Sequence, residues 1–79
     1  MAEELDRVVS IVREIGRMGA LAPDEDLYDA GFSSVNALQL LVELESAFDV
    51  TIPDDEFISA RTPRRLSNLV TRLQQEAKP

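Results

Sequence analysis

The sequence predicts an all-α protein, a bundle of three main helices and one short helix with a long first loop. A chain of 79 residues fits one domain, which we expect to span residues 1–79. Apolar residues recur at spacings of three and four in three separate stretches, which is the period of an amphipathic helix. Gly and Pro interrupt the pattern between these stretches, so each helix has a predicted limit.

The first helix is expected over about residues 3–18. Its apolar side chains follow the helical period: Leu5, Val8, Val9, Val12 and Ile15. Gly16, Gly19 and Pro23 then act as stop signals. Residues 19–33 form a long loop, whose apolar members are expected to pack against the bundle: Leu21, Leu27, Tyr28 and Phe32.

The second helix is expected over about residues 34–48. Its predicted core face consists of Ala37, Leu41, Leu44 and Phe48, with Leu38 and Leu40 at the borders. A second stripe lies outside this arc and is flanked by Glu43 and Glu45: Val35, Gln39, Val42 and Ser46. Two exposed valines can be unremarkable on a protein surface. Alternatively, the stripe is a small apolar docking strip with a negative rim, suited to weak, salt-sensitive encounters.

Two further elements complete the bundle. Residues 50–53 alternate like a short extended segment, and Pro53 then opens a short helix with acidic residues in its first turn. For the last helix, Thr62 is the predicted N-cap and Pro63 fits the first turn. Its apolar stripe has the spacing i, i+3, i+4, i+7: Leu66, Leu69, Val70 and Leu73.

The charges are unevenly distributed along the chain. There are 8 Lys and Arg against 15 Asp and Glu, a net charge of −7. Between Met18 and Arg61 there is no basic residue, whereas ten of the acids lie there, so this interval carries −10. A pI of about 4.3 argues against nucleic acid or an anionic membrane as a partner. The acidic interval is either a solvated surface or a docking face for a basic protein, and the net charge favours a monomer.

Several function classes are excluded by missing residue types. The chain has no Cys and no His, which excludes disulfides, thiolate or imidazole metal sites, a Cys nucleophile and a His general base. We therefore do not expect an enzyme. The acidic start leads into no continuous apolar stretch, and the longest apolar run is far below the roughly 20 residues that span a bilayer. A cytoplasmic location is expected.

Two adjacent serines, Ser33 and Ser34, lie where the long loop meets the second helix. One can cap that helix, and the other then lies in the first turn with its hydroxyl facing solvent. On local grounds both can be N-cap candidates, or one hydroxyl can be a modification site. A phosphodiester there would meet free backbone N–H groups and the positive helix end, worth roughly 0.3–1 kcal/mol.

Two separated segments resemble an acyl carrier protein. The first is the run of residues 26–35, followed by Leu38, Leu41 and residues 43–45, and the second is residues 48–56. The resemblance extends from about Leu5 to Leu73 and implies an acyl-carrier-like bundle of four helices. It further implies that Ser34 takes a covalent 4′-phosphopantetheine arm from coenzyme A, whose thiol holds an acyl or aminoacyl group as a thioester.

The resemblance also implies partners and a docking surface. The partners would be a phosphopantetheinyl transferase, an acyl- or aminoacyl-loading ligase and downstream transferases. The second helix is the family's usual recognition helix. With the stripe described above and the acids of the short helix, it defines the expected docking residues: Ser33, Val35, Gln39, Val42, Glu43, Glu45, Ser46, Asp54, Asp55 and Glu56.

The attachment motif departs from the commonest form of the family. That form is Asp-Ser-Leu, whereas this chain has Ser33-Ser34-Val35, and Gln39 stands where fatty-acid carriers commonly have an acid. The Gly-Phe-Ser-Ser form is similar to stand-alone bacterial carriers, some of which are loaded with amino acids. We therefore predict a specialised acyl or aminoacyl carrier. The alternative is an unmodified acidic helical adaptor that binds a basic protein.

Overall fold

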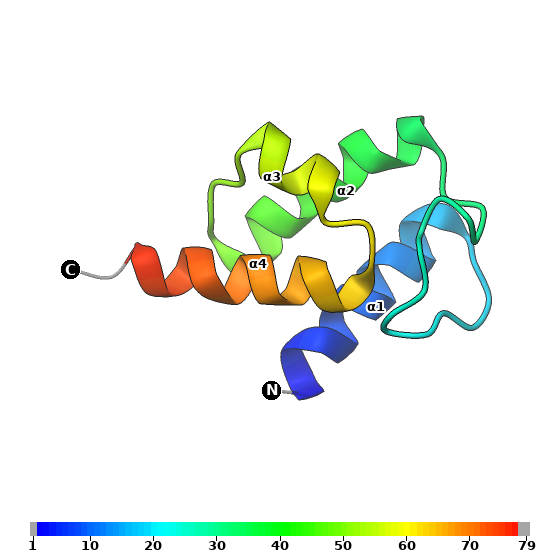
Figure 1. Ribbon diagram of the computed structural model, residues 1–79, viewed down its shortest axis with the longest axis horizontal. Helices are drawn as coiled ribbons and strands as arrows, with labels where there is room; N and C mark the ends of the chain where they lie inside the picture. The colour runs from blue at the N-terminus through cyan, green and yellow to red at the C-terminus, as the bar shows by residue number, and fades with distance from the viewer. Residues whose placement is uncertain (1, 78–79) are drawn as a thin grey trace.

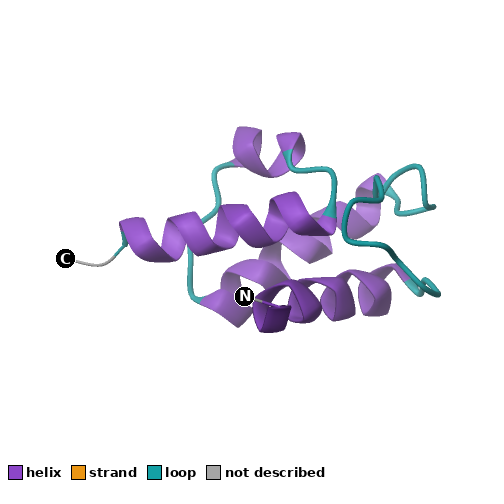
Figure 2. Ribbon diagram, turned by 60° about the horizontal axis from the view of Figure 1, so that its bottom comes forward, coloured by secondary structure: helices purple, strands orange, loops and turns teal. Residues whose placement is uncertain are grey.

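The computed structural model describes residues 2–77 and consists of four helices joined by loops. They are α1 (Ala2–Gly16), α2 (Ser34–Phe48), α3 (Asp54–Ser59) and α4 (Pro63–Glu76) (Figure 1). α1 packs against both α2 and α4, while the short α3 packs against α4. The described residues form helices and loops without a strand (Figure 2), so the predicted all-α class is confirmed.

The core lies where α1, α2 and α4 meet. Each of these helices buries side chains four residues apart, because residues i and i+4 lie on the same helix face. The fully buried pairs are Val8 and Val12, Leu40 and Leu44, and Leu66 and Val70. The long loop adds three buried apolar side chains, as the sequence predicted: Leu21, Leu27 and Phe32.

The core face of α2 is rotated from its predicted centre. Leu40, which was expected at a border, is fully buried, whereas Leu38 on the other border is 68% exposed. At about 100° per residue, these two positions lie about 200° apart, so one narrow face cannot bury both. α2 packs against α1 and α4, and in this packing Leu40 lies in the core whereas Leu38 is left in solvent.

The first helix ends two residues earlier than expected and begins one residue earlier. Arg17 adopts a left-handed conformation (φ 52°), and the N–H of Met18 donates to the carbonyl of Arg13 at 2.9 Å. This arrangement ends α1 at Gly16 by satisfying a carbonyl of its last turn. A Cβ on Gly16 would lie 2.8 Å from the Phe32 ring, so the glycine permits the close approach of the loop to α1.

The short helix begins one residue later than expected. Pro53 is the N-cap of α3 rather than its first helical residue, with φ −61° and ψ 138°. Its extended ψ prevents it from joining the helix. The preceding segment alternates as predicted, with Thr51 exposed and Ile52 buried, but it pairs with no strand among residues 2–77. The predicted cap of α4 is confirmed, because the Thr62 hydroxyl accepts from the N–H of Arg65 at 3.1 Å.

A residue from α1 stabilises the C-terminal end of α2, which has no basic residue in its own last turn. The Arg7 guanidinium lies 4.7 Å from the centre of the Phe48 ring and donates to the carbonyl of Ala47 at 3.4 Å. A cation there is favourable because the C-terminal carbonyls of a helix carry partial negative charge. Asp49 then ends α2 in the left-handed conformation (φ 54°), its N–H donating to the carbonyl of Glu45.

The left-handed conformation of Asp49 predicts how substitutions there change the free energy of unfolding. Asp and Asn tolerate this region, whereas most side chains lose roughly 1–2 kcal/mol there. We expect Asp49→Ala to lower the free energy of unfolding by about 1 kcal/mol. Asp49→Asn should be at least as stable as the parent, because it keeps the local preference and removes a negative charge from a helix C-terminus. Urea unfolding measures both, and an Asp49→Asn protein as unstable as Asp49→Ala would contradict the explanation.

Candidate functional site

The two adjacent serines at the start of α2 have different roles. The Ser33 hydroxyl accepts from the N–H of Asn36 at 3.1 Å, so Ser33 is the N-cap. Ser34 is the first helical residue and is exposed. Among residues 2–77, no group forms a hydrogen bond with the Ser34 hydroxyl. The sequence left the choice of capping serine open, and the structure assigns it to Ser33.

The surroundings of Ser34 fit a phosphodiester. The N–H groups of Ser34 and Val35 have no acceptor within the helix, because the first turn of any α-helix leaves such donors free. The positive end of the helix dipole adds a favourable field for an anion. Leu38, four residues beyond Ser34 and therefore on the same side of α2, is also exposed, so an arm on this hydroxyl would leave directly into solvent.

The loop that leads to Ser34 is folded around Asp26. The Asp26 carboxylate accepts from the N–H groups of Tyr28 at 2.9 Å and Asp29 at 3.1 Å, an arrangement typical of an Asx turn. The N–H of Phe32 donates to the carbonyl of Leu27 at 3.0 Å, and both of these side chains are buried. Because Phe32 is anchored in the core, the next two residues are held at the start of α2.

Two arginines near the start of α4 fasten this loop to the other side of the bundle. Arg61 pairs with Asp26 through two hydrogen bonds of 2.7 and 3.3 Å, and its guanidinium lies 4.6 Å from the centre of the Tyr28 ring. Arg64 pairs with Asp24 at 2.8 Å. The hydrogen bond from Arg61 is the main cause that lowers the pKa of Asp26, and Asp24 raises the pKa of Arg64. Asp24 and Asp26 therefore form ion pairs with arginines of the same chain.

The Asp26 pair predicts a pH dependence of stability. Since the pKa of Asp26 in the folded protein is below its ordinary value of 3.8, its stabilising contribution is present above that pH. It is lost as the pH falls through the lowered pKa. We expect Asp26→Asn to lower the melting temperature at neutral pH, with the difference from wild type shrinking in acid. Thermal melts across this range measure it, with Asp55→Asn as the control, and a difference that stays constant with pH would contradict the prediction.

An exposed apolar strip runs along the outer side of α2. It consists of Val35, Leu38 and Val42, which are 78%, 68% and 59% exposed. The predicted exposure of the two valines is confirmed. Leu38 was expected at the border of the core and belongs instead to the exposed strip. Its position about 200° from Leu40 was the signal that one of the two must face solvent. A further exposed apolar side chain, Ile58, lies on α3.

Most of the polar residues expected around this strip are exposed, but two of the acids are half-buried and bonded within the chain. Gln39, Glu43 and Ser46 are exposed on α2, and Asp54 and Asp55 are exposed in the first turn of α3. Glu45 is half-buried, and its carboxylate accepts from the N–H of Ile52 at 2.9 Å. Glu56 is half-buried and pairs with Arg72. The last two acids thus make contacts within the chain as well.

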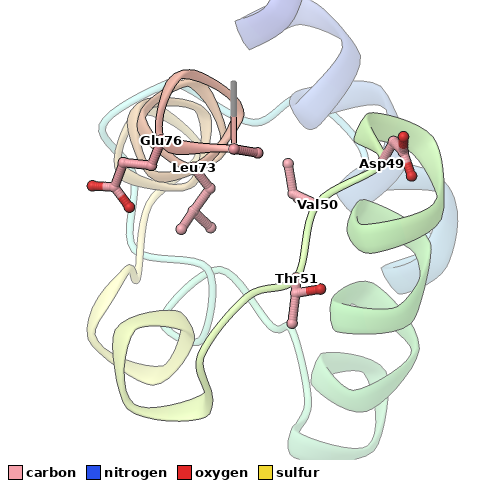
Figure 3. Close-up of a pocket in the computed structure, with 6 residues that line it drawn as sticks. Asp49, Val50, Thr51, Leu73 and Glu76 are labelled. Atoms are coloured by element: carbon pink, nitrogen blue, oxygen red, sulfur yellow. The ribbon is translucent and has the colours of Figure 1, made fainter. Parts of the chain in front are cut away.

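The surface formed by residues 2–77 has several grooves. One of about 370 Å³ lies between α1 and α2, lined by Ile15, Leu38, Gln39, Val42 and Glu43. A second, of about 360 Å³, is at the C-terminal ends of α2 and α4 (Figure 3), with Val50 and Leu73 facing each other across it. A third, of about 320 Å³, separates α3 from α4, and a fourth, of about 370 Å³, involves Glu3, Arg7 and the end of α2. Of these four grooves, the first is the one that includes residues from the N-terminal half of α2.

Metal-binding clusters and membrane-spanning helices are both absent from the part of the chain that the structure describes. Residues 2–77 contain no group of three or more Asp, Glu, His or Cys side chains that could hold a metal ion. In the same residues, no helix has the length and apolar character needed to cross a membrane.

Known proteins similar to this chain include curated carriers. The D-alanyl carrier proteins of Streptococcus mutans and Streptococcus suis are each 54% identical over 35 residues. The match covers 43% of this chain and 44% of each relative, so the chain spans less than half the length of these curated relatives.

Solved structures extend the similarity over nearly the whole chain. The hexanoyl acyl carrier protein of the actinorhodin polyketide synthase from Streptomyces coelicolor has a TM-score of 0.78 and 28% identity, and 92% of each chain is covered. A docking-domain complex of the Pax NRPS has a TM-score of 0.82 at 17% identity, covering 94% of this chain and 72% of that one, which shows the fold alone.

A family model covers most of the chain. The model described as the phosphopantetheine attachment site matches residues 6–70, which include the whole loop, both serines, α2 and α3. The resemblance on which the cofactor expectation rested is thereby confirmed, and the exposed hydroxyl at the positive end of α2 fits that group. The chain belongs to the phosphopantetheine attachment family and is a carrier protein of that family, whose cofactor is a covalent 4′-phosphopantetheine.

Proposed function

We propose that Ser34 carries the 4′-phosphopantetheine arm and that the chain presents small acyl or aminoacyl groups to partner enzymes. The observation that carries this proposal is that the two adjacent serines have different structural roles. Ser33 is engaged as the helix cap, while the Ser34 hydroxyl is exposed and free of hydrogen bonds among residues 2–77. When bound, the arm supplies a thiol that holds its cargo as a thioester.

Attachment requires only simple chemistry from this chain. A new bond forms between Ser34 Oγ and the phosphorus of coenzyme A that bears the pantetheine. The bond from that phosphorus to the adenosine bisphosphate breaks, and the hydroxyl proton goes to a base of the transferase. The chain contributes an accessible oxygen and the helix end, which favours the resulting anionic diester by roughly 0.3–1 kcal/mol. The chain itself catalyses nothing in this proposal.

The proposed cargo is a specialised acyl or amino acid group rather than a fatty acid. The similarity to D-alanyl carrier proteins supports an amino acid, and the similarity to a polyketide carrier supports a short acyl group. The Ser33-Ser34-Val35 motif and Gln39 support the same distinction. The proposed partners are a phosphopantetheinyl transferase, an acyl- or aminoacyl-loading ligase and downstream transferases, acting on a cytoplasmic monomer.

The proposed docking surface is centred on the exposed strip of α2. Val35, Leu38 and Val42 supply apolar contact, and Ser33, Gln39 and Ser46 lie on its polar margin. Negative charge comes mainly from Glu43, Asp54 and Asp55. Glu45 and Glu56 contribute less because they are bonded within the chain. Such a surface suits a partner with an apolar patch and a basic rim.

The first test is an intact-mass measurement. The purified protein is incubated with coenzyme A and a broad-specificity phosphopantetheinyl transferase, and peptide mapping locates the modification. The proposal expects one phosphopantetheine per chain, on Ser34. An arm found on another residue would overturn the assignment. The third outcome is that the transferase adds no arm. If the protein isolated from its native host then carries no arm either, the unmodified acidic adaptor becomes the better description.

A further inference from the structure

Arg61, just before α4, contacts three consecutive residues of the loop that leads to Ser34. Its carbonyl accepts from the N–H of Leu27 at 2.9 Å, which brings the two segments into backbone contact. Its guanidinium donates two hydrogen bonds to the Asp26 carboxylate and lies over the Tyr28 ring. One residue from the far end of the sequence therefore holds the loop through its backbone, a charge and an aromatic ring.

Asp26 is the first residue of a hydrogen-bonded unit of the loop, residues 26–32, which we call the loop unit. Its carboxylate accepts from two N–H groups of this unit, and its carbonyl accepts from the N–H of Ala30 at 3.1 Å. At the other end, the N–H of Phe32 donates to a carbonyl of the unit, and the Phe32 side chain is buried. The loop unit is thus bonded at both ends, and one residue separates it from Ser34.

The start of α2 has little packing of its own. The first buried side chain of this helix is Leu40, six residues beyond Ser34 and about 9 Å further along the helix axis. Residues 34–39 are exposed or half-buried. Segments with few buried contacts open locally at a low cost in free energy. The position of the Ser34 hydroxyl therefore depends on the loop unit that precedes it, and Arg61 holds that unit.

We propose that Arg61 is a positioning residue for the transfer of phosphopantetheine to Ser34. In this transfer Ser34 Oγ replaces the adenosine bisphosphate on phosphorus, and its proton goes to a base of the transferase. By holding Asp26, Arg61 keeps the loop unit folded and the Ser34 hydroxyl directed toward that phosphorus. The inference rests on the proposed attachment at Ser34. Among residues 2–77, Arg61 forms its side-chain hydrogen bonds with the loop and none with the exposed strip of α2.

The test measures the loading rate of Arg61→Ala by intact mass at successive times, with coenzyme A and a transferase that loads the parent chain. We expect kcat to fall about five- to tenfold. A misplacement of 1 Å can cost about 100-fold, but a loosened loop still visits the correct position. KM for the carrier should change by less than about twofold, because the docking strip is intact.

Arg64→Ala is the matched control. The two arginines have nearly equal exposure, 51% for Arg61 and 50% for Arg64, and each pairs with an acid. The partner of Arg64 is Asp24, which lies outside the loop unit. Arg64→Ala removes the same charge next to the same loop, and its kcat should stay within about twofold of the parent. An equal loss of kcat in both variants would attribute the effect to charge and overturn the positioning role.

A double-mutant cycle with Asp26→Asn shows whether Arg61 acts through Asp26. Asparagine keeps a side-chain oxygen for the N–H groups of the loop unit but loses the charge that pairs with Arg61. Arg61→Ala should therefore lower kcat by less than about twofold in the Asp26→Asn background, since residues that act as one unit are not additive. An arginine that contacts the transferase directly would instead lower kcat by the same factor in both backgrounds.

Hydrogen exchange of the unmodified protein separates a local effect from a loss of overall stability. Arg61→Ala should speed the exchange of the Phe32 N–H, which closes the loop unit, more than that of the Leu44 N–H in the middle of α2. An equal acceleration of both would show that the pair serves stability alone and would overturn the positioning role.

The parent chain separates failure of this inference from failure of the attachment proposal. If the parent is loaded on Ser34 while Arg61→Ala keeps its kcat or changes KM alone, the positioning role is wrong and the attachment stands. A parent chain that never gains the mass of the arm, from the broad-specificity transferase or in its native host, overturns the attachment proposal and this inference with it.

Discussion

Ser34→Ala is expected to abolish attachment of the phosphopantetheine arm completely, whereas Ser33→Ala is expected to retain it. The reason is that only Ser34 offers an exposed hydroxyl without a hydrogen bond among residues 2–77, while the Ser33 hydroxyl is used by the N–H of Asn36. Intact mass after incubation with coenzyme A and a transferase measures the outcome directly. Loading of Ser34→Ala together with failure of Ser33→Ala would move the attachment site by one residue.

The free energy of unfolding is expected to fall in Ser33→Ala, which can still be loaded, and to stay nearly unchanged in Ser34→Ala, which cannot. Loss of an N-cap hydroxyl costs about 0.5–2 kcal/mol, so Ser33→Ala should unfold at a lower urea concentration. Ser34→Ala changes an exposed residue that caps nothing, and its free energy of unfolding should stay within about 0.5 kcal/mol of the parent. The variant that cannot be loaded is thus expected to be the more stable one. Loss of loading therefore cannot be attributed to unfolding.

Val42→Arg is expected to weaken binding to the phosphopantetheinyl transferase by about tenfold or more, the effect of losing a central interface residue. Val42 is 59% exposed in the middle of the α2 strip, so the larger side chain fits without disturbing the core. It removes apolar contact and places a positive charge where a basic rim is expected to approach. Titration calorimetry or surface binding of the unmodified protein measures the affinity.

Gln75→Arg is the matched control for that variant. It adds the same charge on α4, at an exposed position near the opposite end of the bundle, and should leave the affinity unchanged. The parent affinity should also fall with rising salt, since exposed charge pairs are screened. A transferase that binds Val42→Arg and wild type equally well would show that the α2 strip is not the docking surface.

Local sequence signals were sufficient for the order of the helices, for the bounds of α2 and for the cap of α4. The start of α2 at Ser34, its last residue Phe48 and the Thr62 cap of α4 were all expected from the sequence. These features depend on residues close together in the chain, where capping side chains and helical periodicity act. The limits of α1 and α3 were each misplaced by one or two residues, at Arg17 and Pro53, because the conformation of single residues decides them.

The charges illustrate what local signals miss. The sequence shows ten acids in an interval without a base, which suggested a continuous acidic docking face. In the folded chain, Asp24, Asp26 and Glu56 pair with arginines that lie 16 to 40 residues later. The acids expected to meet a partner are therefore fewer, and they are concentrated on α2 and α3.

The sequence by itself determined that the chain is helical, where α2 begins and that a serine pair stands at that point. Those properties follow from period and capping, which are local. Only the tertiary structure decided that Leu38 rather than Leu40 faces solvent, that Arg61 holds the loop through Asp26, and that a groove lies between Ile15 of α1 and the exposed side of α2. Each of these depends on which face of a helix its neighbours cover, and burial against distant segments is not encoded in the spacing along one helix.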